Sequence, residues 1–310
     1  MNMNEEVRYG YTISEKMKKV WSIQLKMAEA LMAVCKKYDL KIWAGSGTLI
    51  GAVRDQGFIP WDDDMDFGMF REDYDRLVEV ADKEFKSPLF FQTAYNENDY
   101  SHGHAQLRMD GTTAILPSEI CRNYHLGIFI DIFVLDAVPD DIEEYAALKQ
   151  KATAMKKRLD VFCYKGYGRG ILYYIYTRIL LSAKGIHSYF QEYNDLFRKF
   201  KIAENERVCY MAYRFNERKI FNKHYYDDIL YVPFEDILMP VPLGYDSILR
   251  AEYGDYTIRK QPTSSHGGYI VLDPDRPYSD YLPELRKQWK RQRWVRALKR
   301  IVNIITRKDK

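Results

Sequence analysis

Four aspartates lie within five consecutive positions of this 310-residue chain, inside the segment GFIPWDDDMDFGMF. They are Asp62, Asp63, Asp64 and Asp66. The apolar alternation that follows predicts a strand, on which Asp64 and Asp66 share one face. Two carboxylates that close repel each other unless one takes up a proton or a cation lies between them. Because Mg²⁺ prefers carboxylate and phosphate oxygens, we expect Mg²⁺, or Mn²⁺ in its place, as the cofactor.

Other kinds of segment share this composition. An acidic turn in solvent is the commonest, but Asp66 interrupts the apolar run instead of lying beyond it. A calcium-binding loop that began at Asp62 would need glycine at its sixth position and glutamate at its twelfth, where this chain has Phe67 and Asp73. The D-x-D motif with which a glycosyltransferase holds a metal on a nucleotide sugar remains open.

Two more features favour phosphate chemistry. Gly45, Ser46 and Gly47 fall between a predicted strand and a predicted helix start, where backbone N–H groups can cradle a phosphate. An ordinary tight turn is the alternative. Asp131 interrupts the strand-like run GIFIDIFVLDAVP, and a charge there is costly to bury unless it is paired or binds a metal. A third carboxylate on a neighbouring strand would complete a two-metal site for in-line displacement.

The residues around these motifs supply weaker candidates. Arg54 and Arg108 are candidates to contact substrate phosphate, because a guanidinium can bind phosphate in a bidentate manner; surface ion pairs are the alternative for both. Asp63 is placed with the substrate-binding residues, with a solvent-facing role as its alternative. The histidines that precede the third aspartate lack convincing metal-ligand spacing and are expected to be structural: His102, His104 and His125.

The periodicity predicts an α+β or α/β protein. A long amphipathic helix is expected over residues 13–39, and strands that form a mixed sheet alternate with helices up to residue 140. Beyond that point the pattern is mainly helical and rich in tyrosine. We predict three parts: a catalytic core (1–140), a helix-rich substrate-binding part packed on that core (141–285) and a basic amphipathic tail (286–310).

The charge distribution sets the tail apart from the body. The chain has a formal net charge of +3, and residues 286–310 hold eleven Lys or Arg and one acid, a net +10, so the rest carries 3 − 10 = −7. Trp294, Leu298 and Ile305 belong to an apolar stripe at helical spacing, which predicts an amphipathic helix on an anionic membrane surface. The acidic body and the stripe argue against nucleic acid as a partner. A helix docked on the protein's own core is the third alternative.

The location of the protein is predicted from features that the sequence lacks. No run of about 18 uncharged apolar residues is present, so no membrane-spanning helix is expected. The start, MNMNEEVRYGYTISEK, lacks the apolar segment of a secretory signal. The four cysteines are widely spaced and are expected to be reduced thiols. We therefore predict a cytoplasmic protein, peripheral on the inner face of the membrane.

Two long motifs resemble a known family. The segment GSGTLIGAVRDQGFIPWDDDMDFGMF closely resembles the signature of the LicD family of phosphocholine transferases, which includes the fukutin-like phosphotransferases, and GIFIDIFVLDAVP resembles its second block. The resemblance covers roughly residues 30–260. It implies a nucleotidyltransferase fold related to polymerase β, with a Gly-Ser turn, a D-x-D pair and a third aspartate on a nearby strand. The residues at these positions are Gly45 and Ser46, Asp64 and Asp66, and Asp131. The gap between the turn and the pair is longer than in most nucleotidyltransferases, but typical of LicD-like proteins.

The resemblance also implies a reaction. The family's typical reaction moves phosphocholine from CDP-choline to a hydroxyl of a surface glycan, and CMP departs. The expected partners are therefore CDP-choline or a related CDP-alcohol, and a glycan or lipid-linked glycan acceptor of the cell envelope, such as lipopolysaccharide, teichoic acid or capsule. In this reaction Asp64, Asp66 and Asp131 hold the metal, and Asp131 helps to deprotonate the acceptor. The alternative is a metal-dependent glycosyltransferase that uses a nucleotide sugar.

Overall fold

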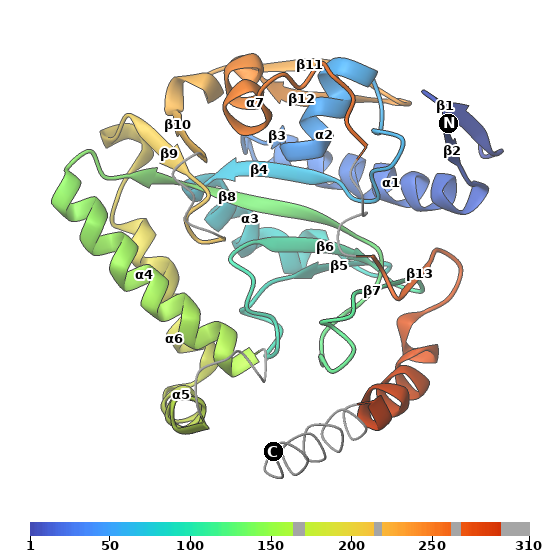
Figure 1. The fold of residues 1–310 in the computed structure, drawn as a ribbon. Coiled ribbons are helices and arrows are strands. Elements are labelled where there is room, and N and C mark those ends of the chain that lie inside the picture. Colours follow the sequence, from blue (N-terminus) through green and yellow to red (C-terminus); the bar gives the residue numbers. More distant parts are fainter. Residues whose placement is uncertain (164–170, 214–218, 262–267, 293–310) are drawn as a thin grey trace, which may run out of the picture.

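The computed structural model describes residues 1–163, 171–213, 219–261 and 268–292 (Figure 1). It shows a mixed α/β protein with a curled, mixed sheet, as the sequence predicts. Helices lie against this sheet, and a separate group of helices stands at one end of it (Figure 1).

The longest strand, β8 (Phe129–Val138), organises the sheet. Alternate residues such as Ile130 and Ile132 are fully buried, as expected for a central strand with β-branched and aromatic residues on both faces. On one edge it pairs in parallel with β4 (Asp66–Phe70). On its other edge the first half pairs with β6 and the second half with β9, both antiparallel. Besides β8 and β4, this sheet contains β3 (Trp43–Ala44), β5 (Leu89–Gln92), β6 (Ala105–Met109), β9 (Arg207–Cys209) and β10 (Ile220–Asn222).

Two helices cover the sheet and bury its apolar side chains. Helix α1 (Glu15–Lys37) begins where the Ser14 side chain accepts a hydrogen bond from the Met17 N–H at 3.2 Å, and it contacts β6 and β8. The buried Trp21 and Leu31 lie on its inner face. Helix α3 (Arg71–Glu84) contacts β4 and β8. The amphipathic helix predicted over residues 13–39 is therefore confirmed, two residues shorter at each end.

Shorter elements surround the acidic strand. They are the β1–β2 hairpin (Glu6–Arg8, Tyr11–Ile13), α2 (Ser46–Ile50), the π-helical turn η1 (Gly51–Asp55), the β7–β13 pair (Thr113–Ile115, Val271–Asp273), the β11–β12 hairpin (Ile229–Phe234, Ile237–Pro242) and α7 (Tyr245–Tyr253). Helices α2 and α7 contact each other, and β12 lies against β3. Segments from the last third of the chain thus lie beside the acidic segment (Figure 1).

A group of three helices stands at one end of the sheet: α4 (Ile142–Cys163), α5 (Ile171–Lys184) and α6 (Ile186–Arg198). These helices pack on one another and enclose a second hydrophobic core, separate from the core beneath the main sheet. Strands β9 and β10 follow this group in the chain and extend the main sheet. The sheet therefore takes strands from both predicted parts, and the division at residue 140 stays a prediction.

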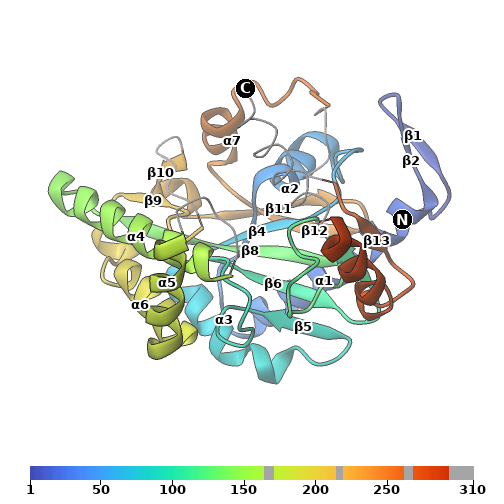
Figure 2. The ribbon, with the colours of Figure 1, turned by 60° about the horizontal axis from the view of Figure 1, so that its bottom comes forward.

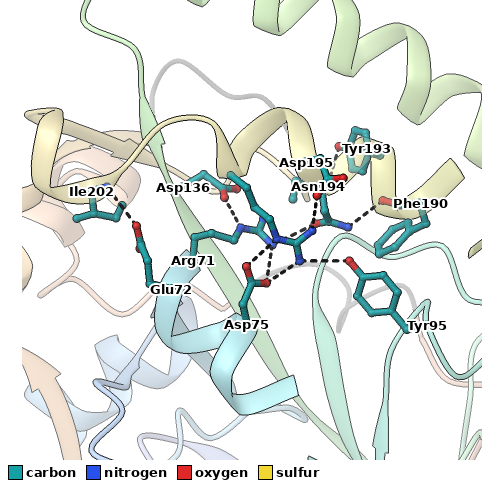
Figure 3. Close-up of polar contacts among 12 residues, drawn as sticks. Arg71, Glu72, Asp75, Tyr95, Asp136, Phe190, Tyr193, Asn194, Asp195 and Ile202 are labelled. Atoms are coloured by element: carbon teal, nitrogen blue, oxygen red, sulfur yellow. Dashed lines mark hydrogen bonds and ion pairs between the residues drawn. The ribbon is translucent and has the colours of Figure 1, made fainter. Parts of the chain in front are cut away.

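A buried polar network joins α3, β8 and α6 (Figure 3). Arg71 donates through Nε to Asp136 Oδ1 at 2.7 Å and through Nη1 to Asn194 Oδ1 at 3.1 Å. Next to it, Arg198 donates to both carboxylate oxygens of Asp75, at 2.7 and 2.8 Å. Burial raises the pKa of Asp136 and the Arg71 charge opposes that effect. The network orients the helical group against the sheet.

The tail is described only up to residue 292, where residues 282–292 are helical. In this part Leu285 and Trp289 pack against the second hydrophobic core, which is the docked arrangement that the sequence left open. The predicted stripe that contains Trp294, Leu298 and Ile305 lies outside the described residues. Among the described helices, none combines the length and the apolar composition needed to cross a membrane.

Candidate active site

Asp66 and Asp131 come together through the register of the sheet. Asp131 is the partner of Asp66 in the parallel β4–β8 pair and of Gln106 in the antiparallel β6–β8 pair. These three side chains stand in a row on one face of the sheet, because register partners on neighbouring strands point the same way. The Asp131 N–H donates to the Met65 carbonyl at 2.8 Å, and the Asp66 N–H donates to Thr48 Oγ1 at 2.8 Å. The peptide group between Met65 and Asp66 is therefore held from both sides, by β8 and by α2.

Asp64 completes a group of three carboxylates. One oxygen from each of Asp64, Asp66 and Asp131 lies within 4.8 Å of the other two. A second group, made by Asp62, Asp63 and Asp64, meets the same criterion, so Asp64 belongs to both. The structure thus brings the three predicted metal ligands together.

Helix α1 holds the loop that carries these aspartates. The buried Trp21 indole N–H donates to the Asp62 carbonyl at 2.9 Å, and the buried Gln24 amide donates to the Asp63 carbonyl at 2.8 Å. Asp63 is itself buried and is absent from the cleft lining. Two side chains of a helix about forty residues earlier in the chain therefore fix the loop through its backbone carbonyls.

The Gly45-Ser46-Gly47 turn packs against the acidic strand. The Gly45 N–H donates to the Asp66 carbonyl at 2.9 Å, and Ser46 has a left-handed φ of 46°. A Cβ at Gly47 would overlap Asp62 Oδ2, so only glycine fits there without a shift of that carboxylate. Ser46 and Gly47 line the cleft described below. Phosphate binding by the turn stays a prediction.

Two polar side chains hold one oxygen of Asp131. The Gln106 amide donates to Asp131 Oδ1 at 2.7 Å, and His104 Nε2 lies 3.0 Å from the same atom. Both side chains are buried. His104 is thus structural, as the sequence predicts, but what it supports is a candidate ligand. Gln106 was not among the residues predicted for the site. A signal was present, because His104 and Gln106 are two apart on a predicted strand and so share a face.

Arg108 is not brought to the cleft. Its side chain is fully buried (0% exposed) and lies over the Phe129 ring. It donates to Gln106 Oε1 at 2.6 Å, to Gln92 Oε1 at 2.9 Å and to the Gly127 carbonyl at 2.8 Å. Arg108 therefore does not make the predicted substrate contact. It orients the side-chain amide of Gln106, and the NH₂ group of that amide donates to Asp131. Arg108, which was predicted to lie at the end of a strand near the site, is thus in the protein interior.

Arg54 does lie on the cleft, but it is already engaged. It donates to Asp55 Oδ2 at 3.0 and 2.7 Å and to the Tyr256 carbonyl at 2.8 Å. Arg259 shares the same carboxylate through Oδ1, at 2.6 and 3.1 Å. These contacts tie η1 to the segment after α7. A phosphate contact by Arg54 would therefore need the guanidinium N–H groups that are not engaged in these bonds.

The aspartates form part of a cleft of about 620 Å³. Its N-terminal side consists of the turn, Arg54, Trp61, Asp131 and three of the four clustered aspartates. The other side comes from much later in the chain and carries two lysines: Tyr213, Lys219, Tyr253, Asp255, Tyr256, Ile258 and Lys260. Lys219 lies 3.3 Å from Glu252. This second side could not be predicted from the sequence, because neither lysine belongs to a motif or a periodic pattern.

Aromatic rings stand next to the carboxylates. Phe133, two residues after Asp131 on the same face of β8, lies 5.0 Å from the Tyr213 ring and 4.5 Å from the His104 ring, between centroids. Phe133, Tyr213 and Trp61 all line the cleft. The site therefore combines clustered carboxylates, two lysines and aromatic faces in one space, which suits a ligand with phosphate and with an apolar or cationic group.

Comparisons with known proteins agree with this arrangement. A family model described as LicD/FKTN/FKRP, nucleotidyltransferase domain, matches residues 39–158, a range that contains all three aspartates. The chain is 30% identical over 238 residues to the lipopolysaccharide cholinephosphotransferase LicD of Haemophilus influenzae, covering 75% of this chain and 88% of that protein. It is 38% identical over 91 residues to an uncharacterised protein of Rickettsia prowazekii, covering 27% of this chain and 32% of that one. It is 28% identical over 89 residues to the mouse ribitol 5-phosphate transferase FKRP, covering 24% of this chain and 18% of that protein.

The fold defines a mixed α/β protein with a carboxylate cluster, and the family model that matches residues 39–158 is described as a nucleotidyltransferase domain. Within that class, the chain belongs to the LicD family, as the first of these relatives and the family match show.

Proposed function

We propose that this protein transfers phosphocholine, or a similar phospho-alcohol, from a CDP-activated donor to a hydroxyl of a cell-envelope glycan precursor, with release of CMP. The observation that carries the proposal is the convergence of Asp64, Asp66 and Asp131 within 4.8 Å of one another in the cleft. The similarity to a lipopolysaccharide cholinephosphotransferase supports the class of reaction. The similarity to a ribitol 5-phosphate transferase extends the class to other phospho-alcohols.

The donor set fits a hard divalent cation. Three carboxylates this close repel one another, and a cation among their oxygens offsets that repulsion. Asp64, Asp66 and Asp131 would hold Mg²⁺, or Mn²⁺, and Asp62 and Asp63 would add oxygens beside Asp64. Bound there, the metal would neutralise charge on the donor pyrophosphate and on the leaving oxygen.

The chain's own residues supply the remaining parts. Lys219 and Lys260 face the cleft and would balance the charge of the donor phosphates. The acceptor hydroxyl oxygen forms a bond to the phosphorus of the phospho-alcohol group, the bond from that phosphorus to the CMP oxygen breaks, and CMP keeps the electron pair. The hydroxyl proton passes to a carboxylate, for which Asp131 is our candidate. Gln106 and His104 would keep that carboxylate in position.

The aromatic side chains of the cleft favour one kind of alcohol as the transferred group. A quaternary ammonium group is attracted to the faces of aromatic rings, most strongly to tryptophan. Trp61, Phe133 and Tyr213 line the cleft within the same space as the carboxylates. These rings favour choline over an uncharged polyol as the alcohol that is moved.

The same proposal includes a polymerase-β-like arrangement of the catalytic core and a location at the inner face of the membrane. Asp66 at the start of β4, with Asp64 in the loop just before it, and the third aspartate on the adjacent β8 support the first point. The net charge of +10 over residues 286–310 supports the second, because an anionic surface attracts clustered Lys and Arg.

The test is thermal stabilisation of the purified protein with Mg²⁺ and a panel of donors: CDP-choline, CDP-ethanolamine, CDP-ribitol, CDP-glycerol, UDP-glucose and GDP-mannose. A ligand at 100 times its Kd that binds only the folded state adds about 2.7 kcal/mol. We expect the largest shift with CDP-choline, and its loss in Asp64→Ala but not in Asp82→Ala, which removes an exposed carboxylate on α3. A shift with a nucleotide sugar alone would reject the proposal in favour of a glycosyltransferase.

A further inference from the structure

Helix α5 carries an apolar stripe on its outer side. Four of its residues are large, apolar and exposed, and they follow the spacing i, i+3, i+4 and i+7: Leu172 (79% exposed), Ile175 (46%), Tyr176 (54%) and Ile179 (65%). At this spacing the side chains lie along one face of the helix. An exposed contiguous apolar face of this kind is typical of a surface that meets a partner or a membrane.

The opposite side of α5 is packed in the ordinary way. Thr177 and Leu181 are fully buried, and α5 contacts both α4 and α6. The Arg178 guanidinium donates to the Phe162 carbonyl at 3.1 Å and lies over the Phe162 ring. The helix is thus held in place by its inner face, and within the described part of the chain the stripe has no role in the core.

The sequence around the stripe is rich in basic residues. Residues 145–187, which include α5 and most of α4, contain nine Lys or Arg and one acidic residue, Asp160. The helical residues 282–292 add the exposed Lys287, Lys290 and Arg291. In Figure 1 α5 lies at the lower left and the helical residues 282–292 at the lower right, and in Figure 2 the two stand on opposite sides of the view. The sequence around α5 is therefore basic, while the chain outside residues 286–310 has a net charge of −7.

We propose that α5 is a membrane-contact helix that lies in the plane of an anionic phospholipid surface, with its stripe among the acyl chains and the neighbouring Lys and Arg at the headgroups. An apolar face flanked by bases has this preference because acyl chains bury the stripe and anionic headgroups attract the bases. Tyr176 suits the boundary, where tyrosine is enriched. A neutral or basic protein partner would not use the charge of this region. The inference stands independently of the transferase reaction.

The experiment is flotation of the full chain with vesicles of phosphatidylcholine alone and of phosphatidylcholine with phosphatidylglycerol. The variant Ile175→Ser/Ile179→Ser removes apolar area without a change of charge. The matched control is Leu230→Ser/Leu238→Ser, two exposed leucines (40% and 59%) on the β11–β12 hairpin. We expect wild type and control to bind the anionic vesicles alike and the α5 variant to bind at least tenfold more weakly. Wild type should bind the uncharged vesicles weakly.

Three outcomes would overturn the inference. Wild-type binding by the α5 variant would assign attachment to other residues, such as the basic tail. An equal loss in the control would mark a non-specific effect of fewer exposed apolar side chains. A wild type that is dimeric by light scattering and an α5 variant that is monomeric, with vesicle binding unchanged, would assign the stripe to contact with a second copy. Circular dichroism and the melting temperature of each variant separate all three from misfolding.

Discussion

Asp66 and Asp131 are direct register partners across the parallel strands β4 and β8, although 65 positions separate them in the chain. A shift of one residue in this register would turn one of the two carboxylates to the other face of the sheet. The hydrogen bond from the Asp131 N–H to the Met65 carbonyl holds the register at that point. The candidate metal site therefore depends on the pairing of these strands as much as on the aspartates themselves.

Replacement of the Asp131 carboxylate should lower activity without lowering stability. Asp131→Asn keeps the shape of the side chain and removes one of three mutually repelling charges, so we expect an unchanged or higher melting temperature without metal. We also expect loss of the stabilisation by Mg²⁺ and a fall in transfer activity of more than about 100-fold, beyond the range for residues that only support a ligand. Calorimetric melting with and without Mg²⁺, beside Asp82→Asn, measures both. A lower metal-free melting temperature with normal Mg²⁺ stabilisation would contradict the site.

Gln106 should act as a positioning residue. Gln106→Leu removes the 2.7 Å hydrogen bond to Asp131 Oδ1 and leaves Arg108 without an acceptor that it reaches at 2.6 Å. We expect metal affinity and activity to fall about 10- to 100-fold, the effect common for residues that orient a ligand. Titration with Mn²⁺ followed by electron paramagnetic resonance measures affinity without turnover. Gln191→Leu, at an exposed position on α6, is the control; an effect on stability with unchanged Mn²⁺ affinity would show a purely structural role.

Gly47 should be intolerant of a side chain. A methyl group there would overlap Asp62 Oδ2, so Gly47→Ala should displace that carboxylate and destabilise the fold by about 1–3 kcal/mol, as overpacking does. Gly45→Ala is the matched control, because its nearest neighbour would be Asp66 Cβ at an ordinary 3.8 Å and its φ is −117°. Urea denaturation of both variants gives the comparison. Equal stability of the two would show that Asp62 moves away freely.

The buried ion pair between α3 and β8 should be sensitive to neutralisation. Asp136→Asn leaves the Arg71 guanidinium, which is 3% exposed, without its 2.7 Å partner. A buried charge left without any partner costs about 3–5 kcal/mol, and because Asp75 remains 3.7 Å from Arg71 we expect a loss toward the lower end of that range. Asp140→Asn removes an exposed ion pair with Arg207 and should cost less than about 1 kcal/mol. Urea denaturation separates the two, and an equally small loss for Asp136→Asn would mean that water reaches Arg71.

Acid should destabilise the protein through His125. Burial lowers the pKa of this imidazole to about 4, helped by the Arg108 charge and opposed by Asp110 at 3.0 Å. The unfolded chain takes up the proton at a pKa of about 6.5, so stability is complete above about pH 6.5 and falls as the pH drops toward 4. The slope from one such group is at most about 1.4 kcal/mol per pH unit. His125→Gln should flatten this limb in pH-dependent melting, whereas the exposed His224→Gln should not.

Much of the candidate site could be predicted from local pattern. The alternation in MDFGMF and in GIFIDIFVLDAVP predicts two strands, and both are present as β4 and β8. The helix over residues 13–39 follows from its 3.6-residue period and is found as α1. These predictions succeed because periodicity reports which side of an element is buried.

Arg108 marks the limit of that reasoning. From the sequence it is a cation at the end of a strand near the site, and guanidinium groups often bind phosphate. The fold surrounds it with Gln92, Gln106 and the Gly127 carbonyl, so its charge acts through Gln106. Local sequence preferences cannot show which hydrogen-bond acceptors from other parts of the chain will surround a side chain.

The sequence by itself determined that Asp64 and Asp66 lie two residues apart, that Asp131 sits inside a buried strand and that the basic residues gather in the tail, because these depend only on spacing and composition. The strand predicted to carry both Asp64 and Asp66 begins only at Asp66, so Asp64 lies in the preceding loop. Only the tertiary structure decided that Asp131 stands opposite Asp66, that Lys219 and Lys260 close the cleft, and that the apolar stripe of α5 faces outward. These depend on strand register and on contacts between segments far apart in the chain, which are set by the packing of the whole protein.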